Sequence, residues 1–258
     1  ALTGASVVVD TAVAVPAGAF QATATGGTLT VGPHAVVDAG GAAVDFQGGA
    51  LVAPGGAIQL GAAGALAVSA GAVLDVSGSP RGGAAGRIAL TSGGQVSVDG
   101  DLRGGAAAGA AGGAFALDGA AIAGGLAPLA AKLQAGGFDA SQEVRVRQQD
   151  LALAAGETLR AHDVVLRSDG GRVRVDGAVE AAGTAASPAG GHIALLGGQG
   201  VEVGAMARLD AHAGDAPAGG VAPASAKVEL AATGGSVDVA AGAAIDVRGG
   251  RSGGGAVA

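Results

Sequence analysis

The stretch Leu66-Ala-Val-Ser-Ala-Gly-Ala-Val-Leu-Asp75 holds two short runs in which apolar residues alternate, separated by a glycine turn. Alternation with a period of two is typical of β-strands, because successive side chains point to opposite faces. Related strings recur along the whole chain, which is therefore a repeat protein. The first apolar residue of each copy lies at position 7, 29, 66, 96, 151, 173, 201 or 237.

A glycine followed by another alternating strand precedes many copies, as in Gly55-Gly-Ala-Ile-Gln-Leu60 and Gly191-His-Ile-Ala-Leu195. Each repeat thus contains about three short strands with glycine-rich turns between them. Most steps between copies measure 22 to 37 residues, which fits one coil of three strands with loops of variable length. Propellers and sandwiches favour antiparallel hairpins and aromatic packing, and both signals are weak here. We expect one all-β domain over residues 1–258, a right-handed parallel β-helix of about eight coils.

One step is longer, at 55 residues, and contains a different pattern. Leu126, Leu129 and Leu133 are spaced three and four apart, and Gly136-Gly137 supplies a helix stop. The sequence therefore predicts a helical insertion at 125–136 that packs over a side of the solenoid.

Composition excludes several classes of protein. The chain of 258 residues has 53 glycines, no cysteine and a formal charge of -7. Lack of cysteine excludes disulfides and thiolate metal sites, and we expect no cofactor. The acidic charge argues against nucleic acid and anionic membrane surfaces as partners. The apolar segment 104–131 is mostly alanine and glycine, which carry little transfer energy, so we expect no membrane insertion.

The motifs Gly-Gly-Xaa-Ile-Ala-Leu and Ala-Gly-Xaa-Xaa-Leu-Asp, with Gly137-Phe-Asp-Ala-Ser-Gln-Glu-Val-Arg-Val-Arg147, resemble filamentous-haemagglutinin-like exoproteins over most of the chain. These are the passengers of bacterial two-partner secretion. The resemblance implies a β-helix shaft, export through an outer-membrane transporter, and a place at the cell surface in adhesion, aggregation or biofilm. The family's secretion domain carries Asn-Pro-Asn motifs, and this chain has no asparagine, so the route applies to a longer parent protein only.

A polar residue closes the repeat in seven coils, and we call these the exit residues. Stacked carboxylates could recruit Ca²⁺, but two arginines interrupt the series and Asp readily accepts turn N–H groups. Turn chemistry on a solvated edge is the favoured interpretation. The exit residues are Asp38, Asp75, Arg103, Arg160, Glu180, Asp210 and Asp246.

Arg145, Arg147, Arg172 and Arg174 alternate with valines and should point outward. They form a candidate interaction face for an acidic glycan. A solvated face paired with Glu143, Glu202 and nearby aspartates is favoured over binding.

Histidines and carboxylates offer little chemistry at sequence level. His162 and His212 occupy matching positions, yet no carboxylate or second histidine shares their spacing. We therefore expect no metal site and no catalytic residue. A polysaccharide-acting β-helix enzyme would need a polar cluster and aromatic platforms, and the chain has no Trp or Tyr. It is predicted not to be an enzyme.

Both ends of the chain match partial repeats, which suggests a segment of a longer repeat protein or a subunit that stacks end to end. Unpaired strand edges there would accept neighbouring copies or adjacent repeats. The end-docking candidates are Val7, Val8, Val9, Ala256 and Val257.

The sequence thus predicts a structural or adhesive shaft of a secreted bacterial surface filament or exoprotein, contacting host or matrix surfaces. The alternative is a self-polymerising filament or sheath subunit.

Overall fold

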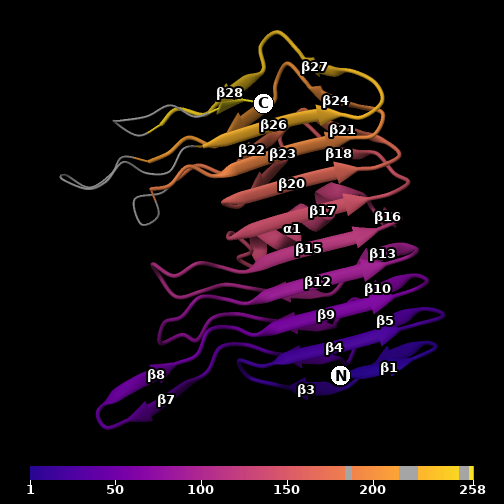
Figure 1. Cartoon of the computed structure of the whole chain (residues 1–258). Helices are drawn as coiled ribbons and strands as arrows, with labels where there is room; N and C mark the ends of the chain where they lie inside the picture. The colour runs from indigo at the N-terminus through magenta and orange to yellow at the C-terminus, as the bar shows by residue number, and fades with distance from the viewer. Residues whose placement is uncertain (184–187, 215–225, 250–255, 258) are drawn as a thin grey trace. The chain divides into compact units, whose positions relative to one another are not determined.

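The computed structural model describes residues 1–183, 188–214, 226–249 and 256–257. They divide into two compact units, one of residues 1–124 and 132–140 and another of residues 125–131 and 141–258. Each unit is a stack of coils, and the strands of successive coils lie side by side in Figure 1.

The first unit contains four coils of three strands each. A fifth coil begins with two strands and continues into a helix. The strands are β1 (Leu2–Gly4), β2 (Val7–Val9), β3 (Ala12–Ala14), β4 (Ala19–Ala24), β5 (Leu29–Val31), β6 (Val36–Asp38), β9 (Ala57–Ala62), β10 (Leu66–Val68), β11 (Val73–Asp75), β12 (Arg87–Ser92), β13 (Gln95–Val98), β14 (Asp101–Arg103), β15 (Ala114–Gly119) and β16 (Ala121–Ile122).

The second unit also contains four coils of three strands, followed by one short strand. These strands are β17 (Ser141–Val146), β18 (Leu151–Leu153), β19 (Thr158–Arg160), β20 (Asp163–Ser168), β21 (Arg172–Val175), β22 (Ala178–Glu180), β23 (His192–Gly197), β24 (Gly200–Val203), β25 (Arg208–Asp210), β26 (Lys227–Ala232), β27 (Val237–Val239), β28 (Ala244–Asp246) and β29 (Ala256–Val257).

Strands of successive coils pair in parallel with equivalent residues opposite one another. Leu66 of β10 lies between Leu29 of β5 and Val96 of β13, and all three side chains are at most 1% exposed. In the second unit Val175 lies between Leu153 and Val203 in the same way. The predicted parallel β-helix is confirmed, with its apolar columns inside and eight three-stranded coils in the described residues.

The predicted helical insertion is also confirmed, as α1 (Leu126–Ala135). Lys132 of α1 donates from Nζ to the carbonyl oxygen of Asp99 at 2.8 Å, which fixes the helix over the corner between β13 and β14. The same 55-residue step also begins with another coil, which the repeat pattern did not predict. Its strand β16 has only two residues, paired with Gln95 and Val96, so it gives almost no alternation to detect.

Apart from α1, the longer described connections of the first unit lie between the third strand of one coil and the first strand of the next. The largest described one is an antiparallel hairpin of β7 (Ala43–Phe46) and β8 (Gly49–Val52), which projects from the coils of the first unit in Figure 1. The spacing of the repeats predicted only a longer loop for this segment. No helix in the described residues is long and apolar enough to cross a membrane.

Candidate functional site

The exit residues form two in-register columns, one in each unit. Asp38, Asp75 and Arg103 are directly opposite one another on β6, β11 and β14. In the second unit the column is Arg160, Glu180, Asp210 and Asp246, on β19, β22, β25 and β28. Because these polar side chains recur at the same position in successive coils, they are the first candidates for a functional site.

Aspartates at exit positions accept backbone hydrogen bonds from the turn that follows. Asp38 Oδ1 accepts the N–H of Gly40 at 2.8 Å, and Asp75 Oδ1 accepts that of Ser77 at 2.8 Å. Asp246 Oδ1 accepts the N–H of Arg248 at 3.1 Å. Each aspartate thereby replaces a ladder partner that the chain loses as it leaves the sheet. The predicted turn chemistry is confirmed at these positions.

Arginines neutralise the stacked carboxylates of the second unit. Arg208 donates to Asp210 Oδ2 at 2.6 Å, and Arg248 donates to Asp246 Oδ2 at 2.7 Å. The hydrogen bond from Arg248 lowers the pKa of Asp246. Burial raises the pKa of Asp210, but the hydrogen bonds from Arg208 and His212 outweigh it and the pKa lies below its ordinary value. Carboxylates of adjacent coils therefore tolerate stacking, because each has its own cation.

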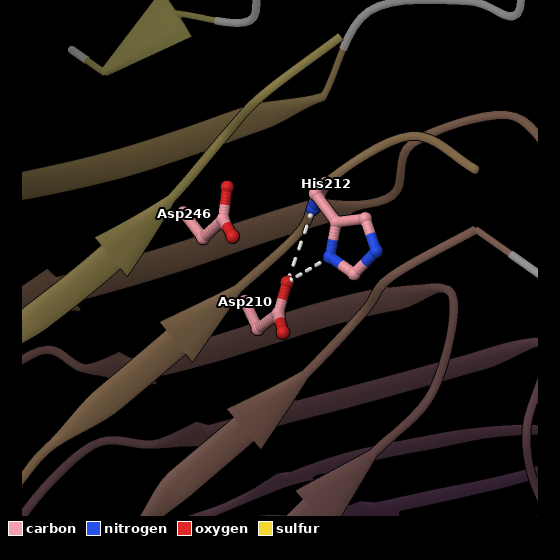
Figure 2. A group of neighbouring side chains, drawn as sticks. All are labelled: Asp210, His212 and Asp246. Atoms are coloured by element: carbon pink, nitrogen blue, oxygen red, sulfur yellow. Dashed lines mark hydrogen bonds and ion pairs between the residues drawn. The ribbon is translucent and has the colours of Figure 1, made fainter. Parts of the chain in front are cut away.

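Asp210, His212 and Asp246 meet at the end of β25 and β28, as Figure 2 shows. His212 Nδ1 lies 2.5 Å from Asp210 Oδ1, and one candidate ligand atom from each residue falls within 4.8 Å of the others. The expectation that no carboxylate accompanies His212 is wrong, and His162 Nδ1 likewise lies 3.4 Å from Asp163. The missed signal for His212 was an aspartate two residues before it, with another at the equivalent position one coil later.

One imidazole and two carboxylates could hold a divalent transition-metal ion. In this arrangement, however, Arg248 donates hydrogen bonds to both carboxylate oxygens of Asp246, and Asp210 already accepts hydrogen bonds from Arg208 and His212. An ion would have to break the Asp210–His212 hydrogen bond beside two guanidinium groups. The two carboxylates are thus already paired with arginine and histidine side chains, as in a structural column of ion pairs.

The four candidate arginines point outward as predicted, but they belong to two sheets. Arg145 is on β17 and Arg147 follows it, whereas Arg172 and Arg174 are on β21. Arg145, Arg172 and Arg174 pair with carboxylates, as the favoured interpretation expected. Arg145 lies 2.7 Å from Asp169, Arg172 2.5 Å from Glu202, and Arg174 2.6 Å from Asp176.

A cleft of about 370 Å³ lies in the first unit, between β14 and the C-terminal half of α1. Asp101 is the carboxylate in its lining, where a glycosidase needs two. Lys132, also in the lining, already donates to the carbonyl oxygens of Asp99 and Gly100. The described lining therefore lacks the pair of acidic groups that hydrolysis of a glycoside requires.

The end-docking candidates lie on edge strands. In β2, Val7 and Val9 are buried at 8% and 3% exposure and Val8 is 71% exposed. Ala256 and Val257 of β29 are exposed. The edge strand β27 leaves Val237 and Val239 at 41% and 48% exposure, whereas the equivalent Val201 and Val203 of β24 are at 0% and 1%.

Comparison of the chain with protein-family models, with curated proteins and with solved structures found no match.

Proposed function

We propose that this chain is a structural shaft in a secreted bacterial surface exoprotein of the filamentous-haemagglutinin-like type. The observation that carries the proposal is that the coils stack through apolar interior columns while their outer charged side chains pair with one another. Interior columns such as Leu29–Leu66–Val96 are apolar throughout. Outer charges pair with a neighbouring coil, as Arg172 does with Glu202, or within one coil, as Arg208 does with Asp210. Such a solenoid extends by adding coils, and its stability is a sum of coil and interface contributions.

The same pairing supports a non-catalytic role. An active site needs groups held ready for a substrate, with perturbed acids and bases in a pocket. Here Asp210 and Asp246 have arginine partners, and the lowered pKa of both residues keeps them ionised at neutral pH. Adhesion needs only exposed surface and length. Host or matrix surfaces, and an outer-membrane transporter for the parent protein, are the partners that this proposal implies.

Location and native size test the shaft proposal together. An antibody raised against this chain should label intact cells, and brief protease treatment of whole cells should remove the label. The native protein carrying this sequence should be much larger than the 258-residue chain on a denaturing gel. A signal confined to the cytoplasmic fraction would overturn the proposal.

A filament subunit that polymerises end to end is the second candidate, favoured by the half-exposed Val237 and Val239 of β27. A coil added there would bury both side chains as β27 buries Val201 and Val203. A native protein of about the size of this chain, rather than a long parent, would support this candidate.

Val8→Pro tests end-to-end stacking at the other edge. Val7 donates its N–H to Thr28 and Val9 accepts from Gly32, so the N–H and C=O of Val8 face the free edge in the alternation of a parallel strand. Proline there removes an edge donor and leaves the pairing with β5 intact. We expect wild type and the Val8→Thr control to associate at high concentration in analytical ultracentrifugation, and Val8→Pro to stay monomeric. A monomeric wild type would rule this candidate out.

A further inference from the structure

The cleft of the first unit forms where α1 takes the place of a strand. β14 is the last strand of the sheet that contains β11, β6 and β3, so one of its edges has no strand beside it. Gly136, which follows α1, meets this edge instead. It accepts the N–H of Gly104 at 2.7 Å, and its Cα lies so close to the carbonyl oxygen of Leu102 that a Cβ would not fit. The end of the helix thus closes one side of the cleft of about 370 Å³.

Leu102 offers a backbone donor at this edge. The N–H of Asp101 donates to Ala72, and the carbonyl oxygen of Arg103 accepts from Val76, so both residues bond to the coil of β11. In a parallel strand alternate residues bond to opposite sides, and the N–H of Leu102 therefore faces the cleft. It has no hydrogen-bond partner among the residues that the structure describes, and Leu102 is only 3% exposed. A sheltered N–H of this kind is expected to meet water or a ligand.

Two cations in the same lining also have donors that are not used. Arg103 makes no hydrogen bond within the described ranges, and its ion pair with Asp75 spans 3.9 Å, beyond hydrogen-bond length. The exit arginine of the second unit differs, because Arg160 donates to Glu180 at 2.8 Å. Lys132 uses Nζ on two backbone carbonyl oxygens, at 2.8 and 3.2 Å, and has a third N–H to offer.

The remaining lining supplies hydrogen-bond acceptors. Asp101 is on the same outward face of β14 as Arg103, and its carboxylate has no ion pair or hydrogen bond in the described part of the chain. The hydroxyl of Ser77 can both donate and accept. Leu102 and Ala135 are the apolar side chains of the lining. Cationic donors, a carboxylate and few apolar groups suit a ligand that carries an anionic group together with hydroxyls.

We propose that this cleft binds a uronic acid unit of an acidic polysaccharide. Arg103, Lys132 and the N–H of Leu102 receive the sugar carboxylate, because a guanidinium matches its two oxygens and each bond is charge-assisted. Asp101 and Ser77 accept hydrogen bonds from the sugar hydroxyls. Two cations against one carboxylate make this lining positive on a chain whose formal charge is -7, so a polyanion is attracted here.

The size of the cleft sets the strength of binding. A volume of about 370 Å³ is at the lower end of small-molecule sites, which measure roughly 300 to 1,000 Å³. One site therefore holds a short piece of polysaccharide weakly, and many shafts on one surface bind by avidity. This inference rests on the proposed shaft function, because it names the matrix chemistry to which the shaft adheres.

An amide NMR titration with sodium D-glucuronate tests the site residue by residue. The signals of Leu102 and Gly105 should shift, and those of the second unit should stay in place. D-Glucose, the matched neutral sugar, should shift neither. Arg103→Gln should raise the Kd about tenfold, as expected for the loss of one charge-assisted pair. Arg87→Gln, which removes an exposed arginine of β12, is the matched control and should leave the Kd unchanged.

Unshifted signals at Leu102 in the presence of glucuronate would overturn the proposal, as would equal Kd values for wild type and Arg103→Gln. N-Acetylglycine, a carboxylate without sugar hydroxyls, separates the ligand classes. If it bound as tightly as glucuronate, the cleft would accept any carboxylate and the assignment to a sugar acid would be wrong. Surface labelling of cells does not depend on this titration, so its failure leaves the shaft proposal to its own test.

Discussion

Single residues inside the coils carry the fold, and Val175 shows how. Its side chain is 0% exposed and stacks between Leu153 and Val203. Val175→Asp would bury a carboxylate among aliphatic neighbours with no cation in the column, which costs several kcal/mol of unfolding free energy. Urea unfolding should show this loss, and Met206→Asp at an exposed turn should show almost none. Equal stability of the two variants would mean that the column is not the core.

Asp75 tests the role of the exit residues. Its Oδ1 accepts the N–H of Ser77, so Asp75→Ala should lose about 1 kcal/mol in urea unfolding. Asp75→Asn keeps an oxygen acceptor and should lose clearly less. If the asparagine and alanine variants were equally destabilised, the charge of Asp75, rather than the turn hydrogen bond, would be the stabilising feature.

At the scale of elements, strands β25 and β28 link stability to pH. The pKa of Asp210 and of Asp246 is lower in the folded protein than in an unfolded chain. The two carboxylates therefore make their full contribution to the free energy of unfolding above the unfolded pKa, at about 3.9. This contribution is lost as the pH falls through the folded pKa. The thermal midpoint should fall steeply below about pH 4.

Arg248→Gln isolates this effect. It should lower the thermal midpoint at pH 7 and have less effect at acidic pH, where Asp246 is protonated as the pH falls through its lowered folded pKa. Arg87→Gln is the matched control, because Arg87 forms no ion pair within the described part of the chain. A penalty for Arg248→Gln that is the same at both pH values would contradict the ion-pair account.

Elements were predictable where their sequence period was long enough. The helix, observed as α1 (Leu126–Ala135), and seven strand pairs of the repeat lie where their spacing placed them. The hairpin of β7 and β8 was not predicted. Its turn is Gln47-Gly48 rather than Asn-Gly or Asp-Gly, and its strands have apolar residues facing solvent, which reverses the usual signal for a core.

On the scale of the whole molecule, sequence alone determined which side of each strand faces inward, because side chains alternate strictly along a strand. It also placed the exit residues at the ends of strands. Only the tertiary structure decided which polar groups meet. Loops of variable length separate successive coils, so the meeting of His212 with Asp246 depends on the register between coils and not on spacing along the chain. Arg145 and Arg174 likewise lie in two different sheets, because each turn between strands places the following strand in another sheet of the coil.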